Sequence, residues 1–91
     1  MRIARSFLAV LLFSTALSLF AAEPSVDLNR ADAETIASVL SGVGLRKAEA
    51  IVAWREAHGP FRSADDLIQV KGIGRATVET NRDRILIDTG D

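Results

Sequence analysis

The chain has 91 residues, of which 11 are basic and 12 acidic, and it contains no cysteine. A chain of this length holds one small domain, and the absence of cysteine excludes disulfides, thiol catalysis and zinc–thiolate sites. One histidine and no tyrosine leave few groups for acid–base chemistry. The composition therefore favours a binding protein over an enzyme, with no metal or cofactor.

Residues 1–22 have the pattern of a secretory signal peptide. Arg2 and Arg5 provide a positive start, residues 7–20 are predominantly apolar, and two small alanines close the segment. The apolar run is shorter than the roughly 20 residues that a membrane-spanning helix needs. Cleavage after either alanine is therefore favoured over an uncleaved anchor. We expect a periplasmic or otherwise extracytoplasmic product whose net charge is −3, because 9 basic and 12 acidic residues remain.

Residues 23–30 are predicted to form a linker or extended segment in which Val26 and Leu28 point the same way. Asp32 is a candidate N-cap for a first helix that reaches Leu40. A turn over residues 41–44 follows, and it leads into a second helix over residues 45–57.

Gly59 and Pro60 end this second helix, since glycine suits the C′ position and proline cannot continue a helix. Phe61 is then expected to return to the core. The first helix of the second half is predicted to begin at a Ser63 cap, with an S-x-x-D pattern that resembles a capping box. Leu67, Ile68 and Val70 are its apolar residues.

A second turn over residues 71–74 leads into a last helix, which runs from Arg75 to residue 83 or 85 and offers Val78, Ile85 and Leu86 to the core. Residues 88–91 are expected to be a frayed tail. Residues 31–87 thus form an all-α domain of four to five short helices, arranged as helix–hairpin–helix twice.

The two turns contain Gly42-Val43-Gly44 and Gly72-Ile73-Gly74, thirty residues apart. Glycine adopts positive φ easily and allows close backbone approach, and helix N-termini attract anions. On this reading Gly44→Val should harm binding by blocking positive φ. Cations stand in the first turn of the helix after each hairpin, where the positive end of the helix dipole disfavours them unless an anion binds at the same place. The predicted phosphate-binding residues are Gly42, Val43, Gly44, Arg46, Lys47, Lys71, Gly72, Ile73, Gly74, Arg75 and Thr77.

Three other assignments stay open on sequence grounds. His58 sits at a helix end and favours a structural role over a catalytic one. Lys47 and Asp65 mimic the lysine and aspartate of some helix-hairpin-helix glycosylases, but the chain is too short to hold a flipped base in a second domain. Trp54 and Phe61 are candidates for base stacking, although covering the seam between the halves is the favoured role.

At this point the sequence resembles the ComEA-like competence proteins, which are exported tandem helix-hairpin-helix domains. The resemblance covers about residues 26–87. Its motifs are Leu28-Asn29, Ala31-Asp32-Ala33-Glu34, Gly42-Val43-Gly44, Lys47-Ala48-Glu49-Ala50-Ile51-Val52, Arg55-Glu56, Gly59-Pro60-Phe61, Asp66-Leu67 and Val70-Lys71-Gly72-Ile73-Gly74.

The resemblance implies sequence-independent binding of double-stranded DNA during DNA uptake in natural transformation. It also implies a membrane DNA-translocation channel and the uptake machinery as partners, and it leaves oligomerisation on DNA open. Ala76 departs from the family pattern, because a basic residue usually stands there, as Arg46 does in the first turn. We therefore expect the first turn to contribute more. The negative net charge supports the alternative, a helical protein-interaction module.

Overall fold

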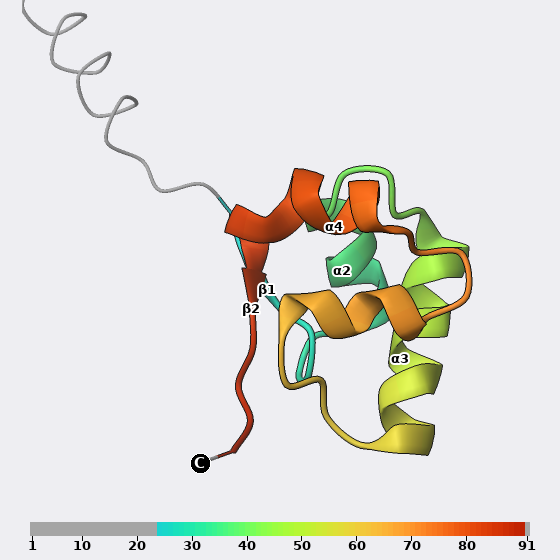
Figure 1. The fold of residues 1–91 in the computed structure, drawn as a ribbon, viewed down its shortest axis with the longest axis vertical. Coiled ribbons are helices and arrows are strands. Elements are labelled where there is room, and N and C mark those ends of the chain that lie inside the picture. Colours follow the sequence, from blue (N-terminus) through green and yellow to red (C-terminus); the bar gives the residue numbers. More distant parts are fainter. Residues whose placement is uncertain (1–23, 91) are drawn as a thin grey trace, which may run out of the picture.

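The computed structural model describes residues 24–90, so the expected signal peptide and its cleavage site lie outside the described residues. The elements are β1 (Val26–Asp27), α2 (Ala33–Val39), α3 (Leu45–His58), the 3₁₀ helix η1 (Ala64–Gln69), α4 (Arg75–Asn81), the 3₁₀ turn η2 (Arg82–Arg84) and β2 (Ile85–Leu86). Figure 1 shows the helices gathered around a common centre, with the strand pair at one side. The predicted all-α class is confirmed, with one small strand pair added.

The first repeat consists of α2, a hairpin over residues 41–44, and α3. Its start follows the sequence, since the Asp32 carboxylate accepts a hydrogen bond from the Thr35 backbone N–H at 2.8 Å and so caps α2. The end of α3 also follows the sequence. Gly59 has φ of +95°, and its N–H donates to the Arg55 carbonyl.

The second repeat, made of η1, a hairpin over residues 71–74, and α4, differs at its start. The predicted Ser63 side-chain cap is wrong, because Ser63 makes no capping bond with its hydroxyl. Its backbone carbonyl instead accepts from Asp66 N–H at 3.2 Å. The Asp66 carboxylate accepts from Arg62 N–H at 2.9 Å, one residue before the position that a capping box requires.

The first helix of the second repeat is also a 3₁₀ helix rather than the expected α-helix. Nine residues separate Ser63 from Gly72, whereas ten separate Asp32 from Gly42. Six 3₁₀ residues rise about 12 Å, against about 10 Å for seven α-helical residues. The stretched helix thus spans a similar length with one residue fewer before the hairpin.

Both repeats and the N-terminal segment contribute to a single core. Its buried apolar residues are Val26, Leu28, Ile36, Leu40, Val43, Ala48, Ile51, Phe61, Leu67, Val70, Ile73 and Val78. Phe61 is fully buried, as predicted. Leu86, expected to be available to the core, is exposed instead, and so is the apolar Ile68. Ile68 lies on the outer side of η1, because a helix with three residues per turn brings Leu67 and Val70 onto one face.

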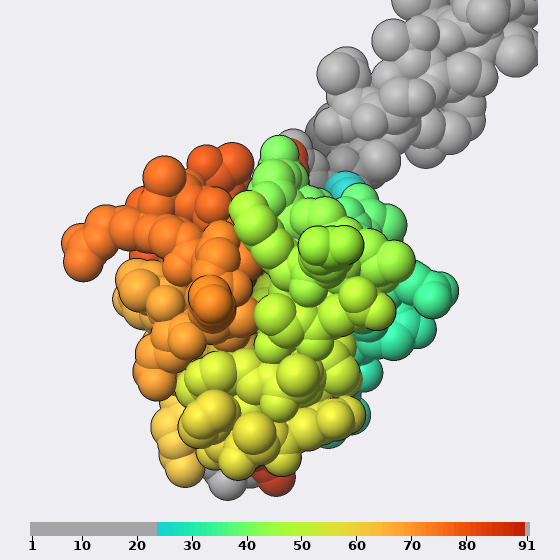
Figure 2. Space-filling model, turned by 90° about the vertical axis from the view of Figure 1, so that its right-hand side faces the viewer, coloured from blue at the N-terminus to red at the C-terminus, as the bar shows by residue number. Residues whose placement is uncertain are grey.

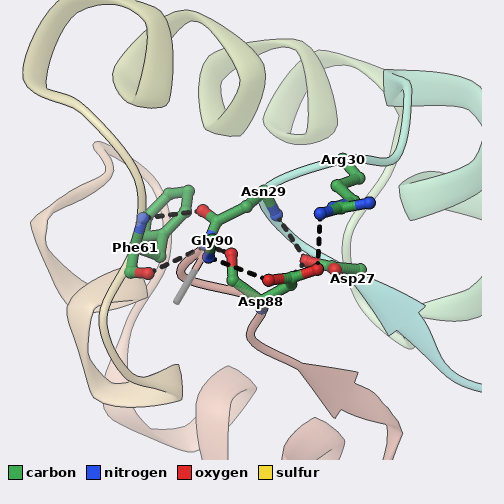
Figure 3. Close-up of polar contacts among 6 residues, drawn as sticks. All are labelled: Asp27, Asn29, Arg30, Phe61, Asp88 and Gly90. Carbon is green, nitrogen blue, oxygen red and sulfur yellow. Dashed lines mark hydrogen bonds and ion pairs between the residues drawn. The ribbon is translucent and has the colours of Figure 1, made fainter.

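The two ends of the domain are joined by β1 and β2, which pair in parallel with Val26 opposite Ile85. Asp88, expected in a frayed tail, is held in place as well. Its carboxylate pairs with Arg30 at 2.7 Å, and its carbonyl accepts from the Asn29 side chain at 2.8 Å. The Asn29 side chain also donates to the Phe61 carbonyl and accepts from the Phe61 N–H (Figure 3).

Candidate nucleic-acid interface

The first hairpin turns at Gly42, whose φ of +76° is in the left-handed region that favours glycine. Val43 follows and is buried in the core. Gly44 is the N-cap of α3 and has no side chain to offer the first turn. The first bond inside the helix runs from Ala48 N–H to the Gly44 carbonyl, so the N–H groups before Ala48 have no partner within α3.

The second hairpin repeats this arrangement thirty residues later. Gly72 has φ of +94°, Ile73 is buried, and Gly74 is the N-cap of α4. Ile73 N–H donates to the Val70 carbonyl at 3.0 Å and closes the turn. In each hairpin the central apolar residue therefore anchors the loop from inside, and only its backbone can face outward.

The positive φ expected at Gly44 is wrong. Gly44 has φ of −74°, and its counterpart Gly74 has φ of −106°, because both are N-caps with extended backbone. Only the first glycine of each hairpin needs the left-handed conformation. A methyl group at Gly44 would meet no atom within 4 Å in the part of the chain that the structure describes. Strain therefore cannot be the reason for glycine there, and room for an approaching ligand remains as the functional explanation.

The two hairpins lie on the same face of the molecule. In Figure 2 the green segment around the first hairpin and the start of α3 lies against the orange segment of the second hairpin and the start of α4. The Lys47 side chain passes over Gly72, within 4 Å of where a Cβ on that glycine would lie. A shallow open hollow beside it is lined by Ser41, Gly42, Ala76, Thr77 and Thr80. These cross-repeat contacts hold the two loops beside each other.

A buried asparagine fixes the first hairpin to the second repeat. Asn81 is 1% exposed, and its side-chain carbonyl accepts from Ser41 N–H at 2.7 Å. Its amide group donates to the Ser41 carbonyl at 2.8 Å and to the Thr77 carbonyl at 2.9 Å. Sequence reasoning missed Asn81. An alignment of the two repeats with the thirty-residue offset would have identified it. The equivalent position in the first repeat is the apolar Ile51, so a polar residue there indicates a specific hydrogen-bonding role.

The charges on this face are available for a ligand. Arg46, Lys47, Lys71 and Arg75 are all exposed, and none of the salt bridges in residues 24–90 includes them. Other arginines are committed to the fold. Arg82 pairs with Asp65 at 2.7 Å and with Glu79, and its hydrogen bond lowers the pKa of the Glu79 carboxyl. Arg55 donates to the carbonyls of Leu28 and Ala31, both at 2.7 Å.

The aromatic side chains pack against one another. Trp54 stacks on Phe61 with ring centroids 4.6 Å apart and on His58 with centroids 4.7 Å apart. Because Phe61 is fully buried, it is not free to stack on a base. His58 Nδ1 lies 3.0 Å from the Trp54 carbonyl, in keeping with a place at the helix end.

Residues 24–90 have neither a cluster of metal-ligating side chains nor a membrane-spanning helix. No group of three or more histidine, aspartate or glutamate side chains is placed to hold a metal ion there. No helix in that range has the length and apolar character required to cross a bilayer.

Comparison with known proteins agrees with this architecture. The family described as the helix-hairpin-helix motif matches residues 21–86. An uncharacterized protein from Haemophilus influenzae is 52% identical over 61 residues, which are 67% of this chain and 54% of that protein. ComE operon protein 1 of Bacillus subtilis is 40% identical over 62 residues, which are 68% of this chain and 30% of that protein.

The kinesin-like protein KIF22 of Rattus norvegicus is 47% identical over 53 residues, which are 58% of this chain and 8% of that protein. The chain therefore spans about half the length of the Haemophilus relative and smaller parts of the other two. The chain belongs to the helix-hairpin-helix family, and its domain is ComEA-like.

Proposed function

We propose that this protein binds double-stranded DNA through its phosphates and without sequence preference. The observation that carries the proposal is the shared face of the two hairpins, where four exposed cations take part in none of the salt bridges of residues 24–90. Backbone N–H groups at the start of α3 and the cations beside them suit anionic oxygens. Donors aimed at phosphates position a protein on DNA and carry no base information.

The negative net charge of the expected mature chain does not oppose this proposal. Net charge governs solubility and long-range association, whereas binding depends on the charges near the site. Asp65 and Glu79 are paired with Arg82, and Asp88 is paired with Arg30. Several acids are thus neutralised locally, while the hairpin cations are not.

We further propose that the protein acts outside the cytoplasmic membrane in DNA uptake during natural transformation. The similarity to ComE operon protein 1 and the signal-like residues 1–22 support this setting. A membrane DNA-translocation channel and the uptake machinery are the proposed partners, and no catalytic role is assigned. Mass analysis of protein from the native host tests export. A product that begins at residue 22 or 23 supports it, and a cytoplasmic product that retains Met1 contradicts it.

A salt titration of DNA binding tests the central proposal. The mature domain is titrated against several unrelated duplexes by fluorescence anisotropy at a series of salt concentrations. With about 3–4 phosphates neutralised, log K should fall against log salt with a slope of roughly −3 to −4. A hundredfold preference for one sequence, or binding that ignores salt, contradicts the proposed mode.

The same experiment decides the alternative of a protein-interaction module. That alternative predicts no DNA binding by a folded domain. The exposed large apolar residues Leu45, Ile68 and Leu86 belong to three different elements. Single exposed apolar residues are normal on monomeric surfaces and do not by themselves indicate a docking patch.

A further inference from the structure

The side chain of Lys47 crosses from the first repeat to the second hairpin. A Cβ placed on Gly72 would lie 3.6 Å from Lys47 Cε and 3.7 Å from Lys47 Cγ. These are ordinary van der Waals distances, so the aliphatic stem runs directly over the glycine. Because Nζ is bonded to Cε, the ammonium group lies beside the second hairpin, although Lys47 follows the first hairpin in sequence.

The reciprocal contact is absent at the first hairpin. The thirty-residue offset places Thr77 where the first repeat has Lys47, and Gly42 where the second has Gly72. A Cβ on Gly42 would meet no atom of residues 24–90 within 4 Å. Thr77 is too short to cover Gly42, and the two residues line the open hollow together with Ser41, Ala76 and Thr80. The first repeat therefore places a cation, Lys47, at the hairpin of the second repeat, whereas Thr77 of the second repeat places none at the first hairpin.

We propose that Lys47 is a phosphate-binding cation of the second hairpin. It fills the role left empty by Ala76, whose equivalent in the first repeat is Arg46. The second hairpin thus has Lys47, Lys71 and Arg75, and the first hairpin has Arg46. From the sequence, the first hairpin is expected to contribute more to binding, because Arg46 and Lys47 follow it. With Lys47 assigned to the second hairpin, the second hairpin has more cations than the first. The assignment rests on the proposed DNA binding.

Reciprocal substitutions provide the test. Lys47→Thr gives the first repeat the residue of the second, Thr77→Lys does the opposite, and Arg46→Thr is the matched control with the same loss of charge one residue away. Binding to a 20-base-pair duplex is measured against salt. Amide ¹H–¹⁵N spectra of the full mature domain, with and without the duplex, locate each effect.

We expect Lys47→Thr to weaken binding about 5-fold at low salt and to reduce the salt slope by about 1. It should shift the Gly72 amide even in the free protein, and DNA-induced shifts should shrink at residues 72–74 while those at 42–44 persist. Arg46→Thr should show the opposite pattern. Thr77→Lys, which has room in the hollow, should strengthen binding about 5-fold and enlarge the shifts at residues 42–44.

Three results overturn the assignment. The first is a loss of DNA-induced shifts at residues 42–44 in Lys47→Thr, which places Lys47 at the first hairpin. The second is an unchanged affinity in that variant, and the third is an unshifted Gly72 amide in the free protein. Each leaves wild-type DNA binding intact, so the proposed function survives. Failure of the wild-type domain to bind any duplex refutes both the proposed function and this assignment.

Discussion

The two repeats place the same hairpin after different helices. In the first repeat an α-helix capped by Asp32 leads into the turn, whereas in the second an uncapped 3₁₀ helix does so. Both turns nevertheless share a left-handed glycine, a buried apolar residue and a glycine N-cap. The hairpin geometry therefore depends on these three positions and tolerates a change in the helix before them.

The repeats also differ in how each hairpin is fixed to its neighbour. The first hairpin is held by hydrogen bonds from the buried Asn81, and the second is covered by the stem of Lys47. The hydrogen bonds from Asn81 are directional and leave the hollow beside Gly42 open. The aliphatic stem of Lys47 covers Gly72 and places an ammonium group beside it. The two loops of one domain are thus expected to differ both in rigidity and in charge.

The largest expected effect is on the free energy of unfolding, and it distinguishes the equivalent positions Ile51 and Asn81. Ile51→Ala should lower the free energy of unfolding by about 2–5 kcal/mol, because it leaves a cavity in the core. Asn81→Ala should lower it by about 1–3 kcal/mol, because Ser41 loses partners for its N–H and carbonyl. Urea denaturation measures both.

Thr80→Ala is the control for the asparagine variant, since Thr80 is exposed and adjacent, and it should change stability by less than about 0.5 kcal/mol. Asn81→Ala should also weaken DNA binding through the loosened first hairpin. An Asn81→Ala domain as stable as the Thr80→Ala domain would show that the asparagine does not clamp the repeats.

The second effect concerns charge at the two hairpins. Arg46→Ala with Lys47→Ala should weaken DNA binding about 30-fold, if each contact contributes about 1 kcal/mol. Lys71→Ala with Arg75→Ala should weaken it less, because each hairpin then keeps one cation (Arg46 and Lys47), whereas the first double variant leaves the first hairpin with none. Circular dichroism should show both double variants folded, as all four side chains are exposed.

Anisotropy titrations at one fixed salt concentration compare the two double variants. If Lys71→Ala with Arg75→Ala weakens binding more than the other double variant, the second hairpin dominates binding through these two cations and without help from Lys47. If neither double variant binds more weakly and both are folded, the DNA-binding proposal fails and the protein-interaction alternative replaces it.

The third effect separates the two glycines of the first hairpin. Gly42→Ala should destabilise the fold by about 1–2 kcal/mol, because a side chain at φ of +76° is strained. Gly44→Ala should leave thermal stability unchanged or slightly raised, since its φ is −74° and the space is open. It should still weaken DNA binding, because the added methyl lies where a phosphate approaches. Equal loss of stability in both variants would contradict the assigned roles.

The smallest effect concerns the two helix starts. The Thr35 backbone N–H bonded to the Asp32 carboxylate holds the pKa of that carboxyl below its ordinary value of 3.8. Asp32→Ala should therefore lower Tm by a few degrees at neutral pH, whereas Ser63→Ala should not change it.

The pH dependence of this cap has a defined sign. A folded-state pKa below the unfolded one gives stability that is present above pH 3.8 and lost as the pH falls through the folded value. Tm values measured down the acid range should show the wild type approaching Asp32→Ala. A gap that stays constant through the acid range would show that the carboxylate is not the cap.

Local signals in the sequence predicted much of this protein, because each depends on neighbours within a few residues. Asp32 capped α2, Gly59 ended α3, and Gly42 and Gly72 turned the two hairpins as expected. Apolar residues read from the sequence also include the buried Leu67, Val70 and Val78, and the helix end at Gly59 predicted the return of Phe61 to the core. Caps, turns and helical periodicity are short-range properties, so they can be read without knowing the fold.

The tertiary structure alone decided the features that join distant residues. It paired β1 with β2, held Asp88 against Arg30, joined Asn81 to Ser41 and brought Lys47 over Gly72. These contacts connect positions that are far apart in the chain, and no local propensity encodes them. Which hairpin a cation serves is for this reason a property of how the repeats pack, and not of where the cation stands in the sequence.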